Sequence, residues 1–290
     1  MSAIGATLVL EGHAFQNPLK ELDGKNLILP LRYLLQAYRN TDPAVKKELA
    51  VPVELVIEAQ QLLKPKSVKF RRVAQLMMIA FFYLLRVGEH TKPRKRTRTV
   101  QFRMKDVLFW KDQLAIAPST AAEEDFIGIQ AGTLRIENQK NGVRNQTMHH
   151  EALVLPNDGC PVDTLVELTK DLRKDKAVDT TLLCAHKIGN NWHHATAQQI
   201  NRSVKWVANK IGLTDRGFPT DRIGSHSLRA GGATAMKLNR IDDMLIKKYG
   251  RWSSDTFLTY IHEQIAGLAD GISTAMAKQI KFYNVAGYGP

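Results

Sequence analysis

The stretch Ser67–Glu89, SVKFRRVAQLMMIAFFYLLRVGE, decides the fold of this chain. From Phe70 to Leu85 its apolar residues recur in steps of three and one, which is the spacing of a broad helical face. Beyond Leu76 it is apolar nearly all round, and a helix that is hydrophobic on every side is buried. Ser67 is a suitable N-cap. We therefore predict a buried central helix that begins after Ser67.

Charged residues follow this helix directly. Arg86 stands at its end, and Glu89 lies three positions later on the same face. An arginine is costly to bury unless it is paired or is held for an anion. A structural ion pair with Glu89 and an anion-binding role both remain open for Arg86.

A basic cluster comes next, Lys92–Arg98, KPRKRTR. The whole chain has 290 residues and a net charge of +13, from 41 Lys and Arg against 28 Asp and Glu. Such a cluster suits a polyanion, whose phosphates it contacts with little reading of sequence. A membrane-lying helix needs large apolar residues, and residues 92–99 contain none. We predict contact with double-stranded DNA, although a solvated loop or a nuclear-import signal gives the same pattern. The candidate DNA-binding residues are Lys92, Arg94, Lys95, Arg96 and Arg98.

Several classes of protein do not fit the composition. The longest apolar run, Leu76–Leu85, is ten residues, whereas a transmembrane helix needs about 20. The first 30 residues contain three acidic residues and no clean apolar block, so we expect no signal peptide. The two cysteines form no CxxC pair, which argues against a disulfide scaffold and a cysteine zinc site. In each of the histidine pairs at 149–150 and 193–194, the two side chains would point to opposite faces of a strand, so we expect no metal site.

The remaining pattern is helices, then a small sheet, then helices, which predicts an α+β fold. Val100, Phe102 and Met104 alternate like a strand. Thr133–Asn138 and Val143–Met148 flank an Asn-Gly turn, which predicts a hairpin with Lys140 near its tip. The predicted helices cover 26–39, 52–63, 162–174, 195–212, 226–237, 241–249 and 253–263.

The segment His226-Ser227-Leu228-Arg229 carries two polar side chains on one helical face. Gly224-Ser225 before it offers a cap, so both would lie in the first turn, where an anion is favoured. Gly231-Gly232 follow within the same helix, where each glycine costs about 1 kcal/mol relative to alanine. We therefore expect another backbone to pass close to this helix.

Taken alone, each candidate catalytic residue has a simple structural explanation. Tyr260 could be a packed tyrosine with its hydroxyl at the surface, and Lys140 could be an exposed residue of a turn. Together, two arginines, a lysine, a histidine and a tyrosine can cut a phosphodiester without a metal. Arginine forks match phosphate oxygens and stabilise the transition state. Tyrosine is a competent nucleophile, and lysine can protonate the leaving oxygen.

In chain order, Leu85–Glu89, Lys140, His226–Arg229, Gly250–Trp252 and Tyr260 resemble the catalytic domain of the tyrosine recombinases (phage integrases). The resemblance covers about residues 52–264. The stretches LLRVGEHTKPRK, SHSLRAGGATAM and GRWSSDTFLTYI resemble recombinases of eukaryotic mobile elements such as Cryptons and DIRS-type retroelements. It implies a mainly helical α+β catalytic domain with a small antiparallel sheet. This domain would span 51–264, between a short helical N-terminal region at 1–50, a reduced core-binding domain, and an amphipathic tail at 265–290.

The resemblance also implies a mechanism that needs neither ATP nor a metal or other cofactor. The tyrosine attacks the scissile phosphate, which leaves a 3′-phosphotyrosine link and a free 5′-hydroxyl, and a second 5′-hydroxyl reverses the step. The implied roles are first catalytic arginine for Arg86, brace for Glu89, general acid for Lys140, proton acceptor for His226, phosphate clamp for Arg229 and nucleophile for Tyr260.

The chain departs from the family pattern at two places. The residue nine positions before the nucleophile is commonly His or Trp, but here it is Arg251, with Trp252 eight before. Either Arg251 replaces the usual donor or the Trp252 N–H serves, and Trp252 also fits simple core packing. In addition, about 50 residues precede the catalytic domain, where the family usually has about a hundred, so we expect either weaker affinity and site choice or a truncated copy derived from a mobile element.

The implied partners are double-stranded DNA and further copies of the chain, in a synaptic tetramer, with no membrane. The tail would pack on its own domain or on a neighbouring protomer. We expect a nuclear protein if the source is eukaryotic, and otherwise one of the cytoplasm or nucleoid. The alternatives are a type IB topoisomerase, which uses similar chemistry, and a domesticated DNA-binding protein that no longer cuts.

Overall fold

The computed structural model describes residues 26–41, 48–92, 99–138, 144–153, 159–252, 254 and 258. It divides the chain into two units, 1–47 and 48–290. In the first unit it describes helix α2 (Leu29–Thr41), with Pro30 in the first turn, where proline is tolerated. All elements named below belong to the second unit.

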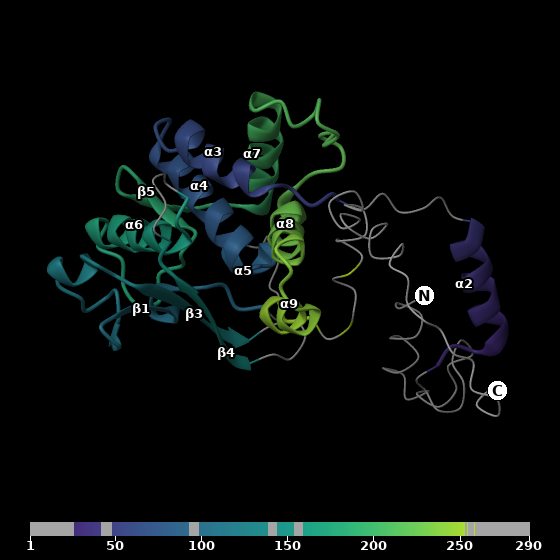
Figure 1. Ribbon diagram of the computed structural model, residues 1–290, viewed down its shortest axis with the longest axis horizontal. Coiled ribbons are helices and arrows are strands. Elements are labelled where there is room, and N and C mark those ends of the chain that lie inside the picture. Colours follow the sequence, from purple (N-terminus) through teal and green to yellow (C-terminus); the bar gives the residue numbers. More distant parts are fainter. Residues whose placement is uncertain are drawn as a thin grey trace, which may run out of the picture. The chain divides into compact units, whose positions relative to one another are not determined.

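Helix α4 (Val68–Phe82) is the centre of the second unit, as predicted. Ser67 caps it, because its hydroxyl accepts a hydrogen bond from the Phe70 N–H at 3.3 Å, and every residue from Arg72 to Phe81 is buried. Four helices contact α4 directly (Figure 1): α3 (Val53–Leu63), α6 (Pro161–Lys174), α7 (Ala197–Lys210) and α8 (Ser225–Leu238).

An antiparallel sheet of four strands has the order β2-β1-β3-β4. Its strands are β1 (Val107–Lys111), β2 (Leu114–Ile116), β3 (Ala131–Asn138) and β4 (Arg144–Glu151). β3 and β4 form the predicted hairpin, with Asn138 opposite Arg144 next to the turn. A second hairpin joins β5 (Ala185–Ile188) and β6 (Asn191–His194), and the sequence analysis missed it. The turn residue Gly189, with φ +59°, was the signal for it.

The predicted strand through Val100 and Met104 is wrong. The Phe102 N–H donates to the carbonyl of Glu89 in helix α5 (Val87–His90), and its carbonyl accepts from the Leu183 N–H in a turn, so neither hydrogen bond goes to a strand of the sheet. A short 3₁₀ helix, η1 (Met104–Asp106), follows, and the sheet begins at Val107. The alternation in this segment reflects burial of Phe102 and Met104 in the core and does not mark a ladder.

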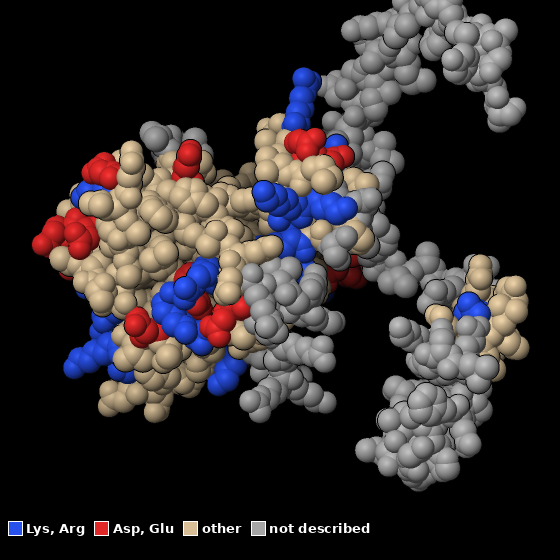
Figure 2. Space-filling model, turned by 90° about the horizontal axis from the view of Figure 1, so that it is seen from below, with Lys and Arg blue, Asp and Glu red and all other residues tan. Residues whose placement is uncertain are grey.

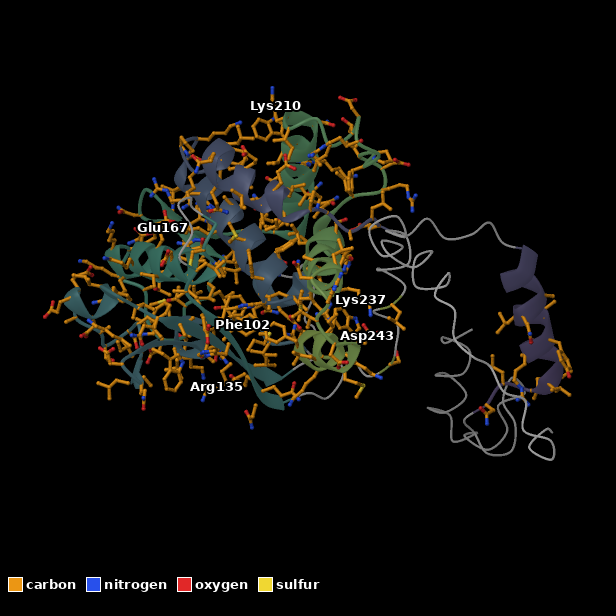
Figure 3. All side chains as sticks on the ribbon, in the orientation of Figure 1. Phe102, Arg135, Glu167, Lys210, Lys237 and Asp243 are labelled. Atoms are coloured by element: carbon orange, nitrogen blue, oxygen red, sulfur yellow. The ribbon has the colours of Figure 1, made fainter. Side chains whose placement is uncertain are left out.

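Helix α8 approaches two backbones, as its glycines predicted. A side chain at Gly231 would collide with the carbonyl oxygen of Val51, and one at Gly232 would collide with that of Phe81 at the end of α4. Helix α9 (Asp243–Gly250) follows α8, and Lys237 and Asp243 join them by an ion pair of 2.5 Å (Figure 3). Among the described helices, none is both long and apolar enough to cross a lipid bilayer.

Candidate active site

Arg86 follows the end of the central helix and is the N-cap of the short helix α5 (Val87–His90). Its backbone N–H donates to Glu89 Oε2 at 2.8 Å, and its Nη1 donates to Glu89 Oε1 at 3.3 Å. The Glu89 side chain is 1% exposed, whereas that of Arg86 is 24% exposed. The predicted pair is therefore present, and Arg86 is the partner that solvent can reach.

Arg251 reaches the same carboxylate from the far end of the chain. It ends α9 in the left-handed conformation, with φ +59°. Its buried guanidinium donates to Glu89 Oε2 at 3.0 Å and to the Leu84 carbonyl at 3.0 Å, and it contacts Met148 Sδ. Burial lowers the pKa of Arg251, and the Glu89 carboxylate opposes that effect. Arg251 thus points into the protein, and Glu89 lies between two arginines.

Arg229 is the third arginine of the cluster and comes from α8. Its Nη1 donates to the Leu84 carbonyl at 2.5 Å, and its Nη2 donates to the Gly250 carbonyl. Its guanidinium carbon lies 4.2 Å from the centre of the Trp252 ring, which is a cation–π contact. Leu84 has φ +47°, and its single carbonyl oxygen accepts from both Arg229 and Arg251.

One further bond closes the network, from Arg86 Nη2 to the Arg251 carbonyl at 3.3 Å. Residues distant in sequence therefore converge where α5, α8 and α9 meet (Figure 1). Two guanidinium groups bond to the Glu89 carboxylate, and a third, that of Arg229, shares the Leu84 carbonyl with Arg251, so three arginines and one glutamate give the cluster a positive balance of charge. Arginine clusters of this kind bind phosphate groups well, because their N–H donors match the phosphate oxygens.

His226 lies in the first turn of α8 with an exposed side chain, while Arg229 in the next turn is buried. The His226 backbone N–H donates to Glu48 Oε2 at 3.1 Å. Gly224 is the N-cap of this helix, within the Gly224-Ser225 pair predicted from the sequence, and Glu48 adds a carboxylate at the helix start. Nothing in the sequence points to Glu48, because 178 positions separate the two residues.

His90 connects α5 to the same region. Its Nδ1 lies 3.0 Å from the Arg86 carbonyl, and because a carbonyl only accepts, Nδ1 carries the proton. Burial lowers the pKa of His90 to about 4, Glu89 opposes the shift, and His226 acts in the same direction as burial. His226 is therefore close enough to α5 for its charge to act on His90.

Of the five candidate DNA-binding residues, Lys92 is described and exposed. It lines a cleft of about 580 Å³, together with Val87 and Ser225, which are the chain neighbours of Arg86 and His226. On the face shown in Figure 2, Lys and Arg side chains gather in two groups, and acidic side chains lie next to both. The other four candidates, Arg94, Lys95, Arg96 and Arg98, lie outside the described residues, as do Lys140 and Tyr260.

The histidine pairs have structural contacts. His149 Nδ1 lies 2.9 Å from the Thr133 hydroxyl, whereas His150 Nε2 lies 2.8 Å from the Phe82 carbonyl. Across the described part of the chain, no group of three or more His, Cys, Asp or Glu side chains is placed to hold a metal ion.

Comparison with known proteins shows the fold. The sequence matches no protein-family model and no curated protein. The structure is similar to the XerH site-specific recombinase bound to a palindromic difH substrate after cleavage, with a TM-score of 0.51 and 18% identity over 80% of this chain. It is also similar to XerH bound to difH before cleavage, with a TM-score of 0.50 and 18% identity over 93% of this chain. The matches span 54% and 63% of the XerH chains. This chain thus has the mainly helical α+β fold of a tyrosine-recombinase catalytic domain, with a small antiparallel sheet.

Proposed function

We propose that this chain is a tyrosine recombinase, an enzyme that cleaves and rejoins double-stranded DNA through a 3′-phosphotyrosine intermediate. The observation that carries the proposal is the arginine cluster. Arg86 and Arg229 are fixed by hydrogen bonds to a buried glutamate and to backbone carbonyls, so their positions are set before any phosphate binds. Preorganised cations of this kind stabilise the charge that develops on a phosphate during transfer. The XerH structures, which have the same fold, are complexes of a site-specific recombinase with its difH substrate.

In the proposed reaction the scissile phosphate binds beside Arg86 and Arg229. The Tyr260 oxygen attacks the phosphorus, and the bond from phosphorus to the 5′-oxygen breaks. The tyrosine proton passes to His226, and Lys140 gives a proton to the leaving 5′-oxygen. Attack by another 5′-hydroxyl on the phosphotyrosine restores the diester and releases the tyrosine. The covalent link conserves the energy of the diester, so the reaction uses no ATP and no metal.

Arg251 and Trp252 have different places in this proposal. Arg251 points inward and pairs with Glu89, so we assign it the task of holding that carboxylate against Arg86. Trp252 is half-buried and stacks on Arg229. The contacts favour Trp252 as the residue next to the bound phosphate and Arg251 as its support.

The wider setting belongs to the same proposal. Recombination joins two duplexes, so the active form would be a homo-oligomer on DNA, in a synaptic tetramer. The motif resemblance supports an origin in a mobile element and, for a eukaryotic source, a nuclear location. The exposed Lys92 and the basic segment after it would contact the DNA backbone.

The test is a denaturing-gel assay with nicked or mismatched suicide DNA duplexes, with a chelator present. We expect a protein–DNA adduct for the wild type and none for Tyr260→Phe, with DNA binding retained in both. Tyr33→Phe is the matched control, because Tyr33 on α2 is 64% exposed, and it should form the adduct.

Two other outcomes contradict the proposal. Salt-sensitive DNA binding without an adduct, across a broad set of duplexes, would favour the non-cutting DNA-binding protein. An adduct that relaxes supercoiled DNA but never joins two duplexes would favour a type IB topoisomerase.

A further inference from the structure

Helix α8 begins without a side-chain cap of its own. Its N-cap is Gly224, which has no side chain, and the hydroxyl of Ser227 accepts from the Gly224 N–H at 3.0 Å. The backbone N–H of His226, also in the first turn, donates to the carboxylate of Glu48. A carboxylate at this place satisfies a helix N–H that has no partner within the helix, and it also interacts favourably with the helix dipole.

Glu48 is held at this position by the residues that follow it, Leu49, Ala50 and Val51; we call Glu48–Val51 the strap. The Leu49 N–H donates to the Arg222 carbonyl at 2.6 Å, and the Val51 N–H donates to the Ser227 carbonyl at 3.4 Å. Leu49, Ala50 and Val51 are all buried. The strap therefore runs along the start of α8, attached on both sides of the His226 amide.

The fit around the Glu48 carboxylate is close. A side chain added at Gly224 would lie 2.6 Å from Glu48 Oε1 and would also collide with Asn201 of α7. Glycine at 224 thus leaves room for a carboxylate that arrives from a distant part of the chain. Glu48 also lines the cleft beside Lys92 and Ser225, on the side of the site where we place DNA.

We propose that Glu48 is a positioning residue for phosphotransfer, which fixes the first turn of α8 and thereby the placement of His226. The inference rests on the proposed function and deepens it. Arg229 is held by carbonyls of two other helix ends, but His226 is exposed and its backbone is tied to Glu48. Without Glu48, the imidazole moves relative to the arginines, and misplacement of a reacting group by about 1 Å costs about 100-fold in rate.

The experiment compares Glu48→Ala and Glu48→Gln with the wild type. Hydrogen exchange of the His226 amide should become about fivefold faster in Glu48→Ala, as expected for a lost cap. Single-turnover cleavage in preformed complexes with suicide DNA should fall by about 100-fold in the same variant. The affinity for DNA should stay at the wild-type value, and the melting temperature should fall by only about 2–4 °C, as expected for the loss of one helix cap from a domain of this size. Glu48→Gln should keep both the exchange rate and the cleavage rate close to the wild-type values, because its amide oxygen still accepts the hydrogen bond.

Glu54→Ala is the matched control. Glu54 pairs with Arg216 at 2.8 Å on the surface, so the variant removes one carboxylate from an exposed ion pair that makes no hydrogen bond to the first turn of α8 among the described contacts. It should leave exchange and cleavage unchanged.

Unchanged exchange at His226 in Glu48→Ala would overturn the proposal. Faster cleavage and tighter DNA binding in both Glu48 variants would also overturn it, because the carboxylate would then be competing with a DNA phosphate. If the wild-type protein forms no adduct with DNA, the proposed function is wrong, and so is the role of Glu48 in phosphotransfer. The exchange measurement would still decide whether Glu48 holds the helix.

Discussion

At the scale of single residues, the site depends on how one buried carboxylate is neutralised. Glu89 was recognisable from sequence as the partner of Arg86, because three positions on a helical face bring the two together. Its second partner, Arg251, was not recognisable, since 162 positions separate them and only the packing of α9 unites them. The motif at 250–252 predicted that either Arg251 or Trp252 donates a hydrogen bond to the phosphate. In the structure Arg251 faces inward and Trp252 stacks on Arg229.

Arg251→Met should destabilise the protein strongly. The substitution leaves the buried Glu89 paired with the partly exposed Arg86 alone among the described side chains, and loss of one partner from a buried ion pair costs about 3–5 kcal/mol. Urea denaturation at pH 7 measures this loss. Arg216→Met is the matched control: its pair with Glu54 has a similar length but is exposed, so a change below about 1 kcal/mol is expected. Equal losses in the two variants would show that Arg251 does not brace the site.

At the scale of elements, sequence reasoning succeeded where a pattern is local. The central helix, its Ser67 cap and the β3–β4 hairpin follow from spacing, capping and an Asn-Gly turn. It failed for Val100–Met104, where burial alternates but the hydrogen bonds of Phe102 go to helix α5 and to a turn. The glycines of α8 were informative because glycine within a helix is costly, and the structure shows the two backbones that require them.

Gly232→Ala should lower the free energy of unfolding by about 2–3 kcal/mol, because the added methyl group collides with the Phe81 carbonyl and α8 must shift away from α4. The urea midpoint measures the change. Gly88→Ala is the control, since an added methyl group there has no neighbour within 4 Å, and it should be neutral or slightly stabilising. A neutral Gly232→Ala would mean that α8 does not approach α4 as closely as described.

At the scale of the whole molecule, the second unit contains histidines that fold in the neutral form. Burial is the main cause that lowers the pKa of His90, His150 and His186 to about 4 in each case. In the unfolded chain a histidine titrates near 6.5. Between these pKa values the unfolded chain binds more protons than the folded chain. The contribution of these histidines to the free energy of unfolding is therefore fully present above about pH 6.5 and is lost as the pH falls toward 4.

His90→Asn should flatten this dependence by up to about one proton, because it removes one titrating group while an amide can still donate to the Arg86 carbonyl. The measurement is the free energy of unfolding in urea at a series of pH values from 4.5 to 7.5. The wild type should lose several kcal/mol over this range, at about 1.4 kcal/mol per pKa unit for each group. The same slope in wild type and variant would contradict a neutral, buried His90.

The arginines of the site are held mainly by main-chain oxygens, at Leu84, Gly250 and Arg251. Every amino acid supplies such an oxygen, so a substitution at position 84 or 250 cannot delete the acceptor, although it can move it. The path of the backbone therefore determines the orientation of the guanidinium groups more than the identity of the side chains at these positions does. Descendants of this sequence can diverge widely around the site and keep its geometry, provided that the ends of α4 and α9 still meet.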